Sequence, residues 1–268
     1  MRDLFAFTSG LPVELTSIHP IDPDIVQAYV ALASHGIVNG DARLPIAPTP
    51  LFVESIVRAR ERAARGEEAG ANALTYGLGQ MLAAAQPSYF HQGLSLTAWE
   101  ARIDRGIGML MRPPARLFLD AGFDVSAAHA MPTRLDLSRG MMGGAYIPAR
   151  LVPDLEQLLE RRLERLAKRL VDAELDPVAV LGLMFEIAHY AREHNFGLYE
   201  AIDVVTPDYP AAMPAGARVV VADRKRLDST LRKQIELAAK PVKKPGVLAK
   251  MMGKGARSGN GRATYPEG

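Results

Sequence analysis

The sequence predicts a predominantly helical α+β protein that has a few short strands and ends in a flexible basic tail. Three observations support this prediction. Apolar residues recur at helical spacing in several long segments, short β-prone runs lie between these segments, and cations accumulate after residue 239. We divide the chain into a mostly helical region at 1–126, a helical region with a small β element at 127–239, and a tail at 240–268.

The segment 176–207 is the one around which we expect the rest of the chain to be organised. Asp176 and Pro177 are typical of a helix start, and Asn195 or Gly197 supplies a left-handed stop. Almost every side chain between these ends is apolar. The helix must therefore be covered on most sides.

The first region is expected to begin with short strands and to continue with helices. A hairpin or two edge strands are expected at 4–8 and 13–18. Pro, Gly and Thr-Pro signals then delimit helices at 24–34, 50–66 and 67–85. The run Thr97-Ala98-Trp99-Glu100 has the pattern of a capping box, so a helix should begin there and bury Trp99, Ile103, Ile107 and Leu110. The sequence Arg112-Pro113-Pro114 breaks that helix, and a short helix follows at 115–121.

The second region should contain a hairpin, a pair of packed helices, a strand and a last helix. The hairpin is expected from 134–137 and 145–147 around a glycine turn at 140–144. A long helix at 153–174 should pack against the buried helix because the link between them is short. Its apolar seam consists of Leu155, Leu159, Leu163, Leu166 and Leu170. The cations expected to face water on this helix are Arg161, Arg162, Arg165, Lys168 and Arg169. The last elements expected are a buried strand at 218–222 and an amphipathic helix at 224–239.

Composition excludes several kinds of chemistry. The 268-residue chain contains no cysteine, which removes disulfides, thiolate nucleophiles and cysteine-ligated metal centres. No P-loop and no Gly-x-Ser-x-Gly elbow is present, so no motif indicates a cofactor. No signal-like run is seen near Met1, and the apolar runs are shorter than the roughly 20 residues that span a bilayer. We therefore expect a soluble cytoplasmic protein without membrane contact.

The buried helix carries one polar stripe, formed by Gly182, Glu186, His189 and Glu193 at spacings of 4, 3 and 4. Two carboxylates beside an imidazole can bind a divalent metal or perform acid–base work. A metal would need a further ligand from another element, for which the candidates are His91, His129 and Asp136. The alternative is that the stripe faces solvent or makes a hydrogen-bonded contact between helices.

A zinc-protease helix is excluded. His189 and His194 are five residues apart, which turns them about 140° from each other on a regular helix. The zinc-protease motif needs two histidines four residues apart, on one face.

The tail is the second candidate site. From Lys240 onward it has a net charge of +6, whereas the preceding 239 residues sum to −4. Its cations are Lys240, Lys243, Lys244, Lys250, Lys254, Arg257 and Arg262. Such a segment can bind nucleic acid or another acidic partner by releasing counterions. Tyr265 is its one aromatic residue, so stacking on bases is not expected to be its main mode of binding nucleic acid. The alternative is a solubilising terminus.

These observations favour a non-enzymatic interaction or regulatory protein. Its helical body would contact a protein partner, and its basic tail would contact an acidic one such as nucleic acid. The first alternative is an enzyme with a metal or acid–base centre at Glu186, His189 and Glu193. The second is a helical subunit of a homo-oligomer that uses part of the leucine seam between chains.

Overall fold

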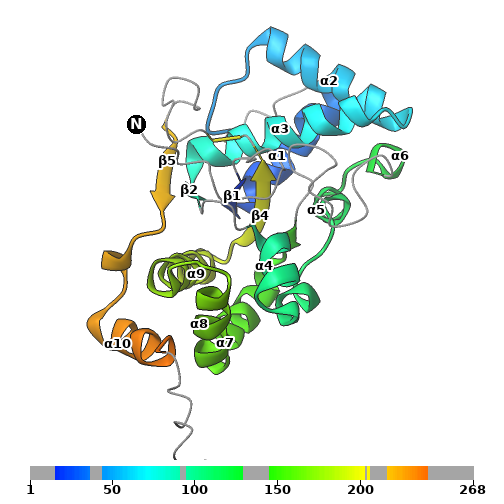
Figure 1. Cartoon of the computed structure of the whole chain (residues 1–268). Helices are drawn as coiled ribbons and strands as arrows, with labels where there is room; N and C mark the ends of the chain where they lie inside the picture. Colours follow the sequence, from blue (N-terminus) through cyan, green and yellow to red (C-terminus); the bar gives the residue numbers. More distant parts are fainter. Residues whose placement is uncertain are drawn as a thin grey trace, which may run out of the picture.

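The computed structural model describes residues 16–36, 44–90, 95–128, 145–202, 204–205 and 216–240, and Figure 1 shows their arrangement. In this part of the chain a five-stranded mixed sheet lies between two groups of helices. The predicted fold class, α+β and mostly helical, is confirmed.

The sheet has the strand order β3-β4-β1-β2-β5. Neighbouring strands are antiparallel except for β2 and β5, which are parallel. The strands are β1 (Thr16–Ile21), β2 (Pro87–Phe90), β3 (Tyr146–Ile147), β4 (Gly197–Ile202) and β5 (Arg218–Val221). Because β1 and β2 come from the first predicted region and the other strands from the second, the two regions share one sheet.

The strand predictions needed three corrections. β1 is the central strand and not an edge strand, since it pairs with β4 on one side and β2 on the other. Strands β2 and β4 were not expected, because β2 has only four residues and a buried glutamate interrupts the apolar run of β4. β5 was expected to be buried, but it lies at the edge of the sheet and is partly exposed.

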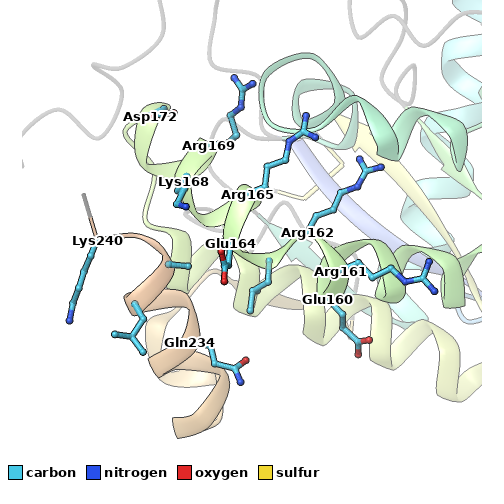
Figure 2. A pocket seen from close by; sticks show the side chains of 13 residues that line it. Glu160, Arg161, Arg162, Glu164, Arg165, Lys168, Arg169, Asp172, Gln234 and Lys240 are labelled. Atoms are coloured by element: carbon cyan, nitrogen blue, oxygen red, sulfur yellow. The ribbon is translucent and has the colours of Figure 1, made fainter. Parts of the chain in front are cut away.

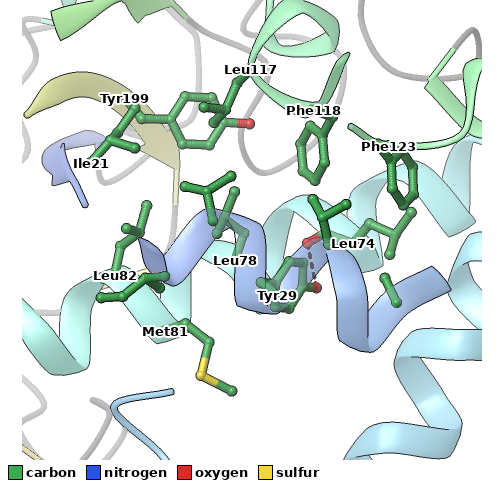
Figure 3. Packing of buried hydrophobic residues seen from close by; sticks show 14 of the residues in the cluster. Ile21, Tyr29, Leu74, Leu78, Met81, Leu82, Leu117, Phe118, Phe123 and Tyr199 are labelled. Atoms are coloured by element: carbon green, nitrogen blue, oxygen red, sulfur yellow. Dashed lines mark hydrogen bonds between the residues drawn. The ribbon is translucent and has the colours of Figure 1, made fainter. Parts of the chain in front are cut away.

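One face of the sheet is covered mainly by helices of the first region. These are α1 (Pro23–His35), α2 (Pro50–Ala64), α3 (Glu68–Ala85), α5 (Pro114–Asp120) and α6 (Val125–Ala128). The predicted bounds of α1, α2, α3 and α5 differ from these by only one or two residues. Figure 3 shows the core beneath them, where the hydroxyl of Tyr29 donates a 2.7 Å hydrogen bond to the carbonyl of Leu74.

The other face is covered by a second helical group. It contains α4 (Leu96–Arg102), η1 (Arg105–Met109), η2 (Ala149–Leu151), α7 (Val152–Arg161), α8 (Leu163–Asp172), α9 (Pro177–His194), η4 (Arg224–Arg226) and α10 (Ser229–Ala238). The central helix α9 has the predicted caps. Asp176 accepts from the N–H groups of Val178 and Ala179, and Asn195 is left-handed at φ 55°.

Three details of this group differ from the sequence prediction. Ser95, not Thr97, caps α4, because its hydroxyl accepts from the N–H of Ala98 while Thr97 binds Glu200. The expected long helix at 153–174 is divided at Arg162 into α7 and α8. The expected helix at 224–239 begins as η4 and continues as α10.

Several predicted features lie outside the described residues. They are the strand at 4–8, the strand at 134–137, the glycine turn at 140–144, and the ligand candidates His91, His129 and Asp136. In the part of the chain that is described, no helix is long and apolar enough to cross a bilayer.

The cap of α9 leads to a first prediction. Asp176→Ala is expected to lower the free energy of unfolding by about 1 kcal/mol relative to Asp176→Ser, because only serine keeps an oxygen that can accept from the first turn. Both variants lose the ion pair with Arg224, so the comparison isolates the cap. Urea unfolding measures the difference. Equal stability of the two variants would contradict the capping role.

Candidate functional site

The polar stripe of α9 changes character along the helix. Gly182 lies against the segment between η4 and α10, since a Cβ there would be 3.0 Å from Cγ of Leu227. Glu186 is half-buried, whereas His189 and Glu193 are exposed. The stripe thus runs from a packed contact out to solvent.

His189 belongs to an ion-pair network between α7 and α9. Arg192 donates from Nη1 to Oε2 of Glu156 at 2.6 Å and from Nη2 to Nδ1 of His189 at 3.0 Å. Nε2 of His189 lies 3.0 Å from Oε1 of Glu193. Because arginine is always a donor, Nδ1 must accept, and Nε2 therefore carries the proton and donates to Glu193.

This network gives little support to acid–base chemistry. Both ring nitrogens of His189 are engaged within the chain, so neither is available to take a proton from a substrate in this arrangement. Among the described residues, no three histidine, aspartate or glutamate side chains are placed to hold a metal ion. The enzyme hypothesis stays a prediction, and these contacts account for the stripe as a link between helices.

The leucine seam bears on the oligomer hypothesis. Leu155, Leu159, Leu166 and Leu170 are fully buried in the core of the chain itself, and Leu163 is half-buried. The four buried leucines are therefore not available for a contact between chains, and the oligomer hypothesis stays a prediction.

Two titratable side chains that we did not single out in the sequence are buried in the sheet. His19 lies between two hydroxyls, with Nε2 2.8 Å from Oγ of Ser17 and Nδ1 3.2 Å from Oγ of Ser88. Burial lowers its pKa to about 3, so the ring is neutral. A histidine inside a β-prone run was the only local signal.

Glu200 is the second such residue, on the opposite face of the sheet. Its Oε2 accepts from the N–H of Thr97 at 3.3 Å and from the hydroxyl of Thr97 at 3.1 Å. Burial raises the pKa of Glu200 to about 7, against the opposing effect of hydrogen bonds from Ser95 and Thr97. Among the described residues, no cationic side chain forms an ion pair with Glu200. A single glutamate among apolar neighbours in 197–202 was its only signal in the sequence.

An open groove lies between α8 and α10, with a volume of about 1060 Å³ (Figure 2). Six cationic and three acidic side chains line it, so the lining has a net charge of +3, and it contains no aromatic side chain. The cations are Arg161, Arg162, Arg165, Lys168, Arg169 and Lys240, and the acids are Glu160, Glu164 and Asp172. We expected the cations of α8 to face water, but the sequence did not indicate that α10 lies beside them.

Arg162 is hydrogen-bonded to a buried carboxylate, with which Arg165 forms a longer ion pair. Nη1 of Arg162 lies 2.5 Å from Oδ1 of Asp104, and Nε of Arg165 lies 3.8 Å from Oδ2 of the same residue. The side chain of Asp104 is only 1% exposed, and its Oδ1 also accepts from the N–H of Gly106. This contact fixes η1 to α8 at the point where the long helix is divided.

The remaining cations of the groove are not neutralised in this way. Arg161, Lys168 and Arg169 are exposed, and none forms an ion pair with a carboxylate of the described residues. In Figure 2, Arg162, Arg165 and Arg169 extend from one side of α8, while Glu164 and Lys168 extend towards α10.

Comparison with protein-family models, curated proteins and solved structures found no match.

The groove is continuous with the start of the predicted tail. Lys240 follows α10, lines the groove and is exposed. The other predicted binding residues, Lys243, Lys244, Lys250, Lys254, Arg257 and Arg262, lie outside the described residues. The chain thus enters its lysine-rich segment directly from a positively charged surface.

Proposed function

We propose that this chain is a non-enzymatic interaction protein whose basic C-terminal region binds an acidic partner. The observation that carries this proposal is the groove between α8 and α10, which has exposed cations without carboxylate partners among the described residues. Lys240 connects this surface to six further cations in 241–268. A polyanion contacting both would release counterions from each, so the groove and the tail would reinforce one another.

Two further expectations belong to this proposal. The cysteine-free composition is compatible with a reducing compartment, and we place the function in the cytoplasm. A protein partner for the helical body also remains part of the proposal.

The proposal is tested by fluorescence anisotropy with labelled oligonucleotides and labelled poly-glutamate. The full chain is expected to bind at least one of these polyanions, and binding should weaken as salt is raised from low to physiological concentration. Neutralising the tail in the full chain should weaken binding at low salt by at least about tenfold. This tail variant replaces Lys243, Lys244, Lys250, Lys254, Arg257 and Arg262 with glutamine. Failure of the unmodified chain to bind either polyanion at low salt would overturn the proposal.

A further inference from the structure

We infer that the acidic partner is a nucleic acid and that its phosphate backbone lies in the groove between α8 and α10, held by Arg161, Lys168 and Arg169. This inference rests on the proposed function and deepens it. It assigns a class of partner and a binding surface on the folded body of the chain, separate from the tail.

Arg161, Lys168 and Arg169 are chosen because their charges are exposed and are not paired with a carboxylate of the described residues. Arg162 and Arg165 also line the groove, but both form ion pairs with the buried carboxylate of Asp104, which partly neutralises their charge. Arg161, Lys168 and Arg169 lie on the exposed surface and have no such partner among the described residues. They come from the end of α7 and from α8, so rigid elements hold their backbones in place.

The shape of the groove suits a polymer better than an enclosed metabolite. Its volume of about 1060 Å³ is slightly above the range of small-molecule pockets, which typically occupy about 300–1,000 Å³ and bury most of the ligand. This groove is instead an open channel between two helices, bordered by cations of α8 and by Lys240, which follows α10. A chain of phosphates can pass along such a surface while its bases remain in solvent.

The lining favours nucleic acid over an acidic protein. Cores of protein interfaces are depleted of charge and enriched in aromatic residues, and the groove offers only Leu163, Leu237 and Ala238 as apolar lining. Interfaces with nucleic acid are more polar and far more positive. Arginine also presents a planar fork that matches two phosphate oxygens. The three acids of the lining repel phosphate and limit the affinity.

Binding should be independent of base sequence, because contacts to phosphates carry no sequence information. In addition, no aromatic side chain lines the groove to stack on a base. Each phosphate contact contributes roughly 0.9 to the slope of log affinity against log salt for duplex DNA. Losing three contacts is therefore expected to reduce this slope by about 2 to 3.

The test compares four full-length chains by anisotropy with labelled duplex DNA of two unrelated sequences. The groove variant is Arg161→Gln/Lys168→Gln/Arg169→Gln. Its charge-matched control, Arg58→Gln/Arg62→Gln/Arg65→Gln, alters exposed cations in or next to α2, on the other side of the sheet. The third chain is unmodified and the fourth is the tail variant. The groove variant should bind at least about tenfold more weakly with a reduced salt slope, and the control should remain close to the unmodified chain.

A gain-of-function variant separates loss of contacts from loss of folding. Glu164→Gln/Asp172→Asn removes two acids from the groove lining and is expected to tighten DNA binding several-fold, which a misfolded chain could not do. Thermal unfolding of every variant provides a second check.

The failures of the two proposals are distinguishable. If the tail variant weakens binding and the groove variant does not, the groove inference is overturned and the proposed function survives. Binding of poly-glutamate without binding of DNA or RNA would likewise remove nucleic acid as the partner and leave the proposed function standing. Absence of binding to every polyanion would overturn both.

Discussion

Replacing Gly70 with alanine is expected to lower the free energy of unfolding by about 3 kcal/mol or more, because α2 and α3 meet backbone to backbone at this position. A Cβ on residue 70 would lie 2.5 Å from the amide nitrogen of Ala63 and 2.6 Å from the carbonyl oxygen of Ala59. Both atoms belong to the backbone of α2. Neither can rotate away, so the helices would have to separate and expose the core beneath them.

The same substitution at Gly182 provides the control. A Cβ there meets only the side chain of Leu227, at 3.0 Å from Cγ, and that side chain can change its position. Alanine also has a higher helix propensity than glycine, by about 1 kcal/mol. Gly182→Ala is therefore expected to be nearly neutral. Urea unfolding of the two variants measures the contrast, and a Gly70→Ala chain as stable as Gly182→Ala would show that α2 and α3 are not this close.

The helices could be predicted because their signals are local. Asp176-Pro177, Thr49-Pro50 and Gly36 each mark a helix end within two or three residues of sequence, and the structure places helix ends at all three. The division of the expected long helix at Arg162 has no such signal. Arg162 contacts Asp104, which lies 58 residues away in the sequence.

The sheet was harder to predict because its pairings are distant. β1 pairs with β4, so Ile18 lies opposite Glu200 although most of the chain separates these two residues in the sequence. A glutamate inside an apolar run argues against a buried strand, and the donors supplied by Ser95 and Thr97 explain why it is tolerated there. Sequence periodicity does not contain this information.

The candidate site was predictable in its charges and not in its shape. The cations of 161–169 were recognised as water-facing, and the tail was recognised as basic. The groove exists because α10 lies next to α8, which no pattern in either helix indicated. The residues of the polar stripe lie on α9, and their neighbours Glu156 and Arg192 engage His189 in contacts that no local pattern indicated.

Glu200→Gln is expected to remove a pH dependence of stability worth about 3 kcal/mol. Burial raises the pKa of Glu200 from its ordinary value of 4.5 to about 7, so the folded chain binds a proton more tightly than the unfolded chain. The stabilising contribution is fully present below pH 4.5 and is lost as pH rises through 7. Glutamine resembles the protonated carboxyl and does not titrate, so the variant should gain stability relative to the unmodified chain over this window.

The measurement is urea unfolding of both chains at pH 5, 6, 7 and 8. His19 contributes in the opposite direction, because burial lowers its pKa from 6.5 to about 3 and its contribution is lost as pH falls. Since both chains retain His19, its effect cancels in the difference between them. Glu61→Gln changes an exposed carboxylate in α2 and serves as the matched control. A difference between Glu200→Gln and the unmodified chain that stays constant from pH 5 to 8 would mean that Glu200 titrates normally and is not enclosed between β4 and α4.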